Sequence, residues 1–286
     1  MPFDDDLSTE ERDTYKLFLS AITPRGDRIC SAALYRFFVD YYDAANFFMF
    51  VIKLVGQADE GRMRAAKALS TISPEDAERY KKTLEKPNLV LNQLSRFSSH
   101  QSKNMVLSAT NSFLCYYSEI IQAAINKRPE LLKSSQTIRL DEVLAFKRYS
   151  DIVSYLVDKR INSLSYGGIL QMEEYMRDRL GIETFKDDDQ KHLLLIFIEL
   201  RNILTHNRGV VNDLFLSRVK NHMGFKFRSG KQFHCDLDVF ARLSKNCIDV
   251  ACDIDKGVCE KFGIQRKRYA TWSTAGANKK RPAPTT

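Results

Sequence analysis

Apolar residues recur every three or four positions along most of the chain, and this period predicts helices rather than strands. In the N-terminal part the period is carried by three segments, residues 7–22, 32–54 and 73–86. The first segment has Ser8 followed by Glu11, the arrangement of a capping box. The third has Ser73 before Pro74, a pair that suits the start of a helix. We therefore expect residues 1–100 to form a helical region.

The helical period is lost over residues 87–103, where Ser and Asn become frequent, and we place a domain boundary near residue 100. A second block of helices is predicted over residues 104–126, 141–163, 169–180, 188–206 and 212–221. A final helix from Asp236 to Gly263 carries one apolar stripe, and a glycine is a common way to end a helix. Residues 101–263 are therefore expected to form a second helical domain.

One segment alternates instead of following the helical period. Residues 224–235 contain two short runs of aromatic and charged residues on either side of Ser229-Gly230, a pattern that predicts a β-hairpin. Residues 264–286 show no apolar period, so we expect a basic disordered tail there. The predicted fold class is all-α: a helical bundle with an N-terminal helical extension and one small β-hairpin.

The positive charge of the chain is concentrated at its C-terminus. The 286 residues carry a formal net charge of +8, yet seven Lys or Arg and no Asp or Glu lie between Lys261 and Thr286. The total charge is therefore weak evidence that the folded body binds nucleic acid. Within the basic segment, Arg266–Arg268 and Lys279–Pro282 resemble the two halves of a nuclear-import signal.

The sequence shows no signal for export or membrane insertion. The start, MPFDDDLSTEERD, is acidic, whereas an export signal begins with basic residues followed by apolar ones. The longest apolar stretch, residues 44–56, is interrupted by Lys53 and is too short to cross a bilayer. We expect a cytoplasmic protein without a membrane segment, or one imported into the nucleus through its basic tail if the source is a eukaryote.

The cysteines lack the CxxC spacing of many metal and redox sites, and this scatter is typical of reduced, mostly buried thiols. The six are Cys30, Cys115, Cys235, Cys247, Cys252 and Cys259. A zinc site built from His222, His234 and Cys235 is disfavoured, because structural zinc ligands usually come in closely spaced pairs. We predict no metal and no cofactor.

The segment Ile198–Asp213, IELRNILTHNRGVVND, ends the most apolar predicted helix with its most polar cluster. At about 100° per residue, Arg201, Asn202 and His206 lie on one side of that helix. One explanation is structural, since cations near the C-terminus of a helix interact favourably with its dipole. Three features instead favour a functional role: the amide of Asn202 next to Arg201, the position of the polar residues on one side of the helix, and the apolar surface beside them. Together they resemble one half of a functional site.

The sequence RNILTH from Arg201 to His206, followed by NRGVVND, resembles the signature of HEPN domains (higher eukaryotes and prokaryotes nucleotide-binding). The flanking sequences CYYSEIIQAAINKRPELL and NDLFLSRV are also similar to that family. The resemblance covers roughly residues 105–225, and it implies a helical bundle of HEPN type. Many HEPN domains are ribonucleases that need no metal.

The resemblance implies an endoribonuclease whose products end in a 2′,3′-cyclic phosphate and a 5′-hydroxyl. It assigns catalysis to Arg201 and His206, with Asn202 as a polar helper. Histidine suits proton transfer because its ordinary pKa of about 6.5 lies near neutral pH, and arginine presents a fixed fork of donors to phosphate oxygens. Residues that we expect to bind RNA flank the signature or lie on the predicted hairpin: Asn207, Arg208, Arg218, Lys220, Lys226, Arg228 and Lys231.

A single chain supplies one arginine and one histidine, whereas cleavage requires both a base and an acid. HEPN domains typically pair, so the resemblance implies a homodimer with a composite active site. The apolar residues Leu194, Leu195 and Ile198 suit either that interface or packing within the chain. The family also implies a toxin or defence effector that is restrained by a regulatory protein partner, a ligand or the N-terminal helices.

Two other functions are compatible with the signature. A non-catalytic helical module that binds RNA or a protein would retain it as a structural cap. A module that is modified by a partner nucleotidyltransferase fits less well, because such relatives usually carry a Tyr two residues after the signature His, and position 208 here is Arg. RNA cleavage in the presence of EDTA distinguishes the enzyme from the binding module.

Overall fold

The computed structural model describes residues 26–72, 77–132, 140–144, 146–219, 224–233 and 235–277. These residues are almost entirely helical, with one short pair of antiparallel strands, which confirms the all-α prediction. The elements in order are β1 (Ile29–Cys30), α2 (Ala32–Ile72), α3 (Ala77–Leu84), α4 (Leu89–Ser95), α5 (Ser98–Lys127), η2 (Pro129–Leu132), α6 (Leu140–Leu144), α7 (Tyr149–Tyr175), η3 (Met176–Leu180), α8 (Asp188–His206), α9 (Asp213–Arg218), α10 (Leu237–Phe262), β2 (Lys267–Arg268) and α11 (Tyr269–Ala277). The helix predicted over residues 7–22 and the Ser73–Pro74 helix start lie outside the described residues.

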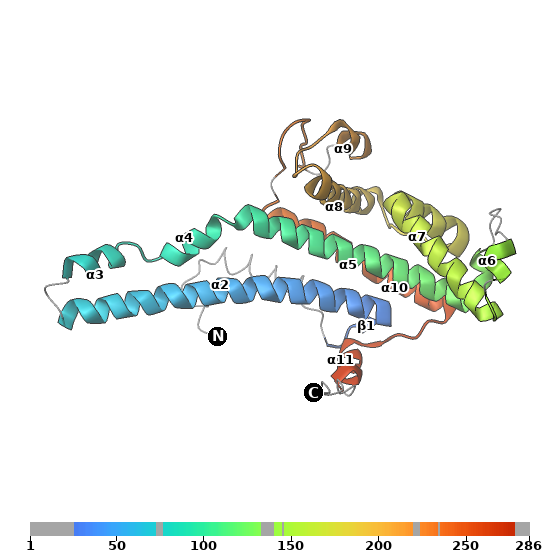
Figure 1. Cartoon of the computed structure of the whole chain (residues 1–286), viewed down its shortest axis with the longest axis horizontal. Coiled ribbons are helices and arrows are strands. Elements are labelled where there is room, and N and C mark those ends of the chain that lie inside the picture. Colours follow the sequence, from blue (N-terminus) through green and yellow to red (C-terminus); the bar gives the residue numbers. More distant parts are fainter. Residues whose placement is uncertain are drawn as a thin grey trace.

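Helices α2 and α5 lie side by side and run in opposite directions along the length of the molecule (Figure 1). Helix α10 lies behind α5 (Figure 1). Helix α8 packs against both α5 and α10, above α5 in this view, whereas α2 lies below α5. Large aromatic residues fill the space between the helices: Phe37 of α2 packs against Phe113 and Tyr116 of α5, with ring centroids 6.2 and 5.8 Å apart. Burial of such rings is the main force that holds helices of this kind together.

The boundary that we placed near residue 100 does not separate two hydrophobic cores. Tyr41 of α2 stacks on Phe240 of α10 with centroids 6.4 Å apart, and both residues belong to the same buried cluster as Phe113 and Phe197. Residues before and after position 100 therefore share one core. The helical period could not predict this, because it identifies an apolar face without identifying the distant helix that covers it.

The second half of α2 leaves this core and packs with α3 and α4, forming an extension at one end of the molecule (Figure 1). Asp59 of α2 is buried and accepts hydrogen bonds from the backbone N–H groups of Val90 (3.1 Å) and Leu91 (2.9 Å) at the start of α4. Arg62 pairs with Asp59 at 3.1 Å and donates to the carbonyl of Thr83 in α3. One ion pair thus satisfies the ends of two short helices.

The helices predicted over residues 141–163 and 169–180 differ from the structure: residues 140–144 form the separate short helix α6, and residues 149–175 form one kinked helix, α7, which continues into the π-helical turn η3. The kink lies at Gly168, whose φ of +77° and ψ of −176° interrupt the helix. A residue with a Cβ rarely adopts this conformation, so glycine permits the sharp change of direction. The two arms of α7 meet at an elbow (Figure 1).

Residues 264–277 are ordered, so the prediction of a disordered tail is wrong for this part of the chain. Strand β2 pairs with β1, and α11 packs against the start of α2. The Trp272 indole N–H donates to the carbonyl of Cys30 at 3.0 Å, and Arg266 forms an ion pair with the buried carboxylate of Asp255 at 3.0 Å. The C-terminal segment therefore fastens the start of α2 to α10.

The error about this segment has a physical cause. Its apolar residues Ile264, Tyr269 and Trp272 follow no helical period, yet all three pack against the hydrophobic core. Its basic residues suggested solvent exposure, whereas the Arg266 side chain is only 22% exposed and neutralises a buried carboxylate. The rest of the predicted tail, residues 278–286, lies outside the described residues.

The chain turns at Ser229–Gly230 as predicted for the hairpin near residues 224–235, but its backbone pairing differs. Residues 231–233 pair with residues 209–211 instead of with the preceding arm. The contacts are Val211 N–H to Lys231 O (2.9 Å), Phe233 N–H to Gly209 O (2.9 Å) and a bridge between Val210 and Gln232. The first arm of the predicted hairpin contributes to the core instead. Phe225 and Phe227 are buried, and Phe227 packs edge-on against Phe215 with ring centroids 4.9 Å apart. The antiparallel strand pair of the fold is β1 with β2.

The described residues include no helix with both the length and the apolar character needed to span a membrane. All six cysteines are free thiols; Cys30, Cys247 and Cys259 are buried, and Cys115 is exposed. Burial raises the pKa of Cys30 and of Cys259 to about 12, with the charge of Asp255 acting in the same direction. These two thiols are therefore poor nucleophiles.

Candidate functional site

Helix α8 carries the RNILTH signature and is buried along most of its length. Asp187 caps its start by accepting the N–H of Gln190 at 2.7 Å. All residues from Leu193 to Leu200 are buried, because α5, α9 and α10 contact this helix. The covered residues include the apolar set that we considered for a dimer interface, Leu194, Leu195 and Ile198, which are 0, 8 and 4% exposed. Packing within the chain uses this surface, so an interface between two copies must lie elsewhere.

The C-terminal end of α8 forms a tight turn with unusual backbone geometry. The N–H groups of Asn207 and Gly209 both donate to the carbonyl of Ile203, at 2.8 and 2.9 Å. Gly209 has a φ of +82°, and Arg208 has a φ of +53°. Among the described residues Arg208 is the only non-glycine with positive φ. This conformation costs an ordinary L-residue about 1 kcal/mol, so the turn holds Arg208 at a small energetic expense.

Arg201 is half-buried and is held by two amide oxygens. Its Nε donates to Oδ1 of Asn111 in α5 at 3.1 Å, and its Nη1 donates to Oδ1 of Asn202 at 3.1 Å. Among the described residues, no carboxylate forms an ion pair with this guanidinium. The positive charge of Arg201 is therefore oriented without being neutralised, and part of its donor fork remains available.

His206 lies in the last turn of α8 and is exposed. On an ideal helix a separation of five positions places two side chains about 140° apart in direction and about 7.5 Å apart along the axis. In keeping with this, Arg201 leans toward α5, and no hydrogen bond within the described part of the chain joins it to His206. The structure brings Arg201 and Asn202 together and leaves His206 apart from them, so the shared side expected from the sequence is a broad arc with Arg201 and His206 at its two edges.

The expected RNA-binding residues fall into different classes. Arg218 of α9 pairs with the buried Glu199 of α8, with Nη1 3.1 Å from Oε1, and this pair fastens α9 onto α8. The Asn207 amide donates to the carbonyl of Val210 at 2.6 Å and stabilises the turn. Arg208 is exposed. Lys220 lies outside the described residues.

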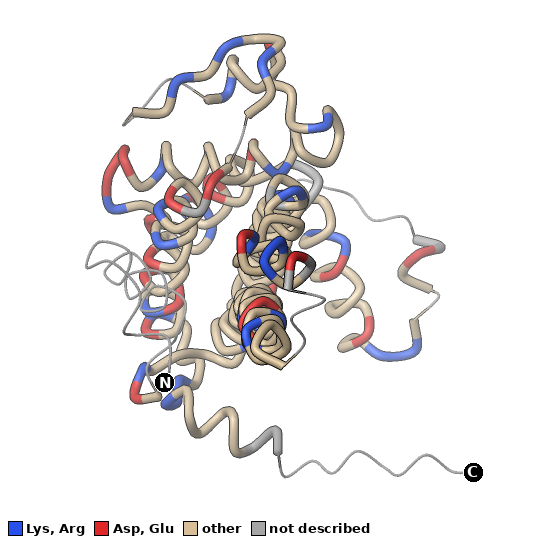
Figure 2. Tube along the Cα trace, turned by 90° about the vertical axis from the view of Figure 1, so that its left-hand side faces the viewer, with Lys and Arg blue, Asp and Glu red and all other residues tan. Residues whose placement is uncertain are grey.

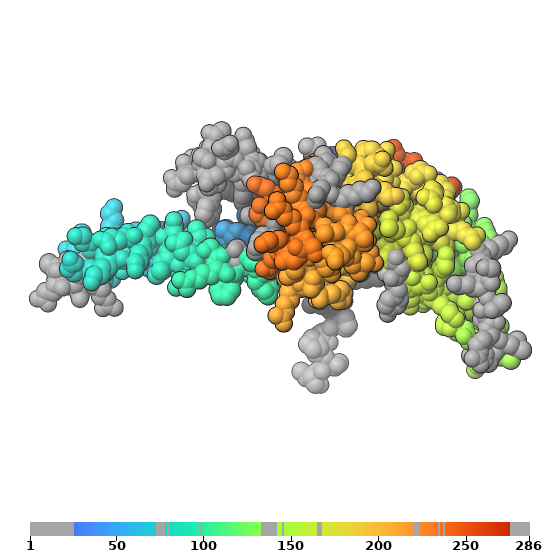
Figure 3. Space-filling model, turned by 90° about the horizontal axis from the view of Figure 1, so that it is seen from above, coloured from blue at the N-terminus to red at the C-terminus, as the bar shows by residue number. Residues whose placement is uncertain are grey.

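A basic surface surrounds the turn at the end of α8. The pairing of residues 209–211 with 231–233 brings the exposed side chains of Lys226, Arg228 and Lys231 into the same region as Arg208. Figure 2 shows the blue segments of Lys and Arg gathered on these loops above α8, with little red among them. Seen from above, the same region lies between the extension and α7 (Figure 3). We call Arg208, Lys226, Arg228 and Lys231 the basic rim.

Asn111 is a residue of this site that the sequence did not indicate. It is exposed, lies on α5, and reaches Arg201 across 90 positions of the chain. Nothing in its local sequence distinguishes it from other polar residues on the surface of a helix. Only the packing of α5 against α8 identifies it as the residue that orients the guanidinium.

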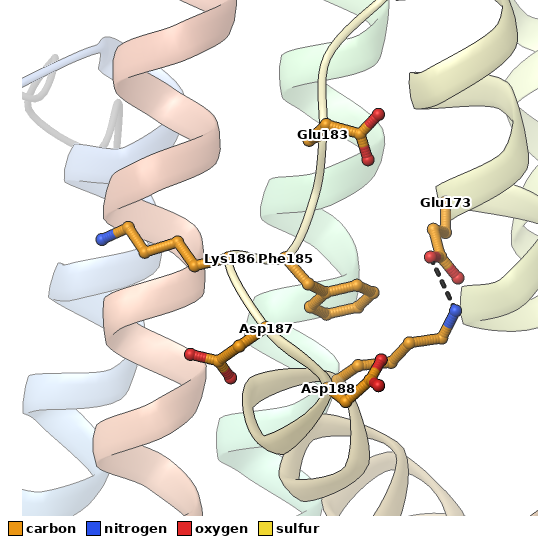
Figure 4. Close-up of a pocket in the computed structure, with 7 residues that line it drawn as sticks. Glu173, Glu183, Phe185, Lys186, Asp187 and Asp188 are labelled. Carbon is orange, nitrogen blue, oxygen red and sulfur yellow. Dashed lines mark hydrogen bonds and ion pairs between the residues drawn. The ribbon is translucent and has the colours of Figure 1, made fainter.

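A hollow of about 360 Å³ lies at the opposite end of α8 (Figure 4). Its lining contains four carboxylates, those of Glu173, Glu183, Asp187 and Asp188. Lys191 pairs with Glu173 at 2.8 Å, and Lys186 extends toward α10, where it pairs with Asp253 at 2.6 Å. The hollow is therefore acidic and would repel a phosphate backbone. Glu173 itself is largely buried, since its side chain is only 15% exposed.

The described residues contain no group of three or more His, Cys, Asp or Glu side chains with an arrangement that could hold a metal ion. His222 and His234, which we considered as zinc ligands with Cys235, lie outside the described residues.

Comparison of the chain with protein-family models, with curated proteins and with solved structures finds no match. The resemblance to HEPN domains consequently rests on the signature and its flanking sequences.

Proposed function

We propose that the chain is an endoribonuclease of HEPN type that cleaves RNA without a metal ion and leaves 2′,3′-cyclic phosphate and 5′-hydroxyl ends. The observation that carries the proposal is the state of Arg201. Arg218 of the neighbouring helix α9 shows the other arrangement, in which a guanidinium pairs with a carboxylate, here that of Glu199 on α8. Arg201 is held instead by Asn111 and Asn202, so its charge remains available for a phosphate.

In the proposed reaction Arg201 binds two oxygens of the scissile phosphate and stabilises the charge that develops on them. A preorganised guanidinium does this well because it is already oriented before the reaction begins. Asn202 and Asn111 act as positioning residues for Arg201. The basic rim would hold the neighbouring phosphates of the RNA strand, since exposed Lys and Arg that neutralise phosphates supply most of the sequence-independent affinity.

His206 is proposed to transfer the protons. As a base it takes the proton of the 2′-hydroxyl, the 2′-oxygen attacks phosphorus, and the bond from phosphorus to the 5′-oxygen breaks. The 5′-oxygen needs a proton from an acid, and one His206 cannot be base and acid in the same step. We therefore propose a homodimer in which His206 of the second copy supplies that proton. The exposure of His206 leaves it free to meet a second copy.

The proposal is tested by incubating the full chain with mixed RNA in EDTA and analysing the product ends. The wild type should cleave and leave cyclic phosphates, and His206→Ala should lose at least about a hundredfold in rate, the usual contribution of a general acid or base. His100→Ala is the matched control, because His100 is also exposed but lies at the start of α5. Equal activity of His206→Ala and His100→Ala would refute the role of His206.

A second function, binding of RNA without cleavage, is favoured by one observation. Arg218 and Asn207 both have partners within the fold, and Arg201 is bonded to Asn111 and Asn202. A module with these contacts would use the signature to fasten α8 to α5 and α9. It would bind RNA through the basic rim, show no cleavage in EDTA, and lose affinity in basic-rim variants but not in His206→Ala.

A further inference from the structure

The elbow of α7 encloses a second hollow, which lies on different elements from the RNILTH site. Its volume is about 400 Å³, within the range of small-molecule sites. Arg160, Ser163 and Leu164 line it from the first arm of α7. The other arm and η3 contribute Gln171, Glu174, Tyr175, Asp178 and Arg179. The two arms diverge at Gly168, where the helix changes direction. The space beside Gly168 is open, since no heavy atom lies within 4 Å of the position that a Cβ would take there.

Arg160 is fixed in place on one wall of this hollow. Its guanidinium lies over the ring of Tyr175, 4.8 Å from the centroid. Tyr175 is itself anchored, since its hydroxyl donates to the carbonyl of Leu131 at 3.1 Å. An arginine that is stacked in this way loses little conformational freedom when it binds an anion.

Arg179 contributes a second positive charge to the lining. Burial raises the pKa of the Tyr175 hydroxyl, and the charges of Arg160 and Arg179, which line the hollow with it, oppose this rise. Among the described residues, neither arginine forms an ion pair with a carboxylate. Of the two acidic residues of the lining, Asp178 is already paired with Arg177 at 2.9 Å. The lining itself has two arginines and two carboxylates, and Arg177, the partner of Asp178, raises the positive charges at the site to three against two negative ones.

We propose that the elbow of α7 binds a small phosphorylated molecule that also carries hydroxyl groups. Arg160 and Arg179 would take the phosphate, because guanidinium groups match its oxygens with paired donors. The hydroxyl of Ser163, the amide of Gln171 and the carboxylate of Glu174 provide donors and acceptors for the hydroxyls. Leu164 and the Tyr175 ring supply an apolar floor. The site stands independently of RNA cleavage.

The proposal is tested by calorimetric titration of the full chain with ribose 5-phosphate, inorganic phosphate and ribose. Ribose 5-phosphate should bind most tightly, with a dissociation constant below about 1 mM, because it alone satisfies both the arginines and the hydroxyl-binding groups. Arg179→Gln should weaken its binding by about tenfold or more, as expected when one charge-assisted contact is lost. Glu174→Gln should strengthen the binding of inorganic phosphate, since it removes the opposing charge.

Two variants complete the design. Arg160→Gln should also weaken binding, and its melting temperature must be measured because the change removes the stacking on Tyr175. Arg148→Gln is the matched control, since Arg148 is exposed at the start of α7 and does not line the hollow. Absence of binding by ribose 5-phosphate at about 10 mM would overturn the proposal. Two other results would overturn it as well: an Arg179→Gln variant that binds ribose 5-phosphate as tightly as the wild type does, or equal affinities of the wild type for ribose and ribose 5-phosphate.

Discussion

Arg208 combines a strained backbone with an exposed, charged side chain. Its φ of +53° is rare for a residue with a Cβ, whereas glycine adopts it readily. Such strain persists where the surrounding structure fixes the backbone, and here Asn207, Gly209 and Gln232 all form hydrogen bonds within the turn. The turn would fold as easily with a glycine at this position. An arginine held in a strained conformation points to a role for its charged side chain.

The Arg208→Gly variant should separate stability from binding. The free energy of unfolding should stay the same or rise by up to about 1 kcal/mol, because the steric cost of the left-handed conformation disappears. The affinity for single-stranded RNA should fall, and its dependence on salt concentration should weaken by about one phosphate contact. Urea denaturation and RNA titrations at several salt concentrations measure these effects.

The control for this prediction is Arg208→Lys, which keeps both the charge and the strain. It should bind RNA nearly as well as the wild type. If Arg208→Gly bound RNA with wild-type affinity and salt dependence, the turn would have no part in RNA binding, and the basic rim would lose its central residue.

Single residues also show where prediction from the sequence stops. The sequence identified Arg201, Asn202 and His206 as a group because they follow each other on one helix. It could not identify Asn111, since the contact depends on how α5 packs against α8. It also could not foresee that Arg218 is paired, because its partner Glu199 lies on another helix and the contact depends on how α9 packs on α8.

At the scale of helices, the ion pair of Asp59 and Arg62 stabilises the extension that α3 and α4 form with the second half of α2. Burial raises the pKa of Asp59, but the N–H groups of Leu91 and Val90 and the guanidinium of Arg62 outweigh this effect and hold the pKa below its ordinary value of 3.8. The ionised carboxylate therefore stabilises the folded state at pH values above 3.8. This contribution is lost as the pH falls through the depressed pKa of the folded state.

Asp59→Asn should unfold at a lower urea concentration than the wild type at neutral pH, because the amide cannot accept the same charge-assisted bonds. The gap between the two proteins should shrink as the pH falls below 3.8. Glu60→Gln is the matched control, since Glu60 is the next residue and its side chain is 59% exposed. A gap that is constant from neutral to acid pH would show that the charge of Asp59 does not support the extension.

The helices themselves were largely predictable, and the exceptions have physical causes. The predicted ends of α8 agree with the structure at both termini, because an acidic N-cap and an Asn-Arg-Gly turn mark them clearly. The predicted end of α2 at residue 54 is too early, since the helix continues to Ile72 once α3 and α4 cover it. Segment 264–277 was missed because its order depends on contacts with β1 and Asp255, which lie far away in the sequence.

At the scale of the whole molecule, one continuous core joins α2 to the helices of the signature. Residues 32–45 therefore do not form a separate N-terminal domain that could move as a regulator. Their aromatic side chains are part of the wall that supports α5, and α5 in turn carries Asn111. The N-terminal region therefore supports the helix that carries Asn111, the partner of Arg201.

The proposed homodimer makes a prediction about the whole assembly. Light scattering should give twice the mass of the chain, 33.0 kDa, at concentrations where RNA is cleaved, and specific activity should fall when dilution separates the copies. Adding an excess of the His206→Ala chain to the wild type should lower the activity, because a mixed dimer has only one His206 and therefore lacks either the base or the acid. A monomer with full activity at every concentration would eliminate the composite site.

The central claim is that the unneutralised guanidinium of Arg201 stabilises the transition state of RNA cleavage. The most direct test is the single-turnover cleavage rate of Arg201→Lys in EDTA, because lysine keeps the positive charge but loses the fixed fork of donors. The account predicts that the rate falls by about a hundredfold while RNA affinity stays nearly unchanged. Cleavage by Arg201→Lys within about threefold of the wild-type rate would contradict it, since transition-state stabilisation by the fork requires a larger loss.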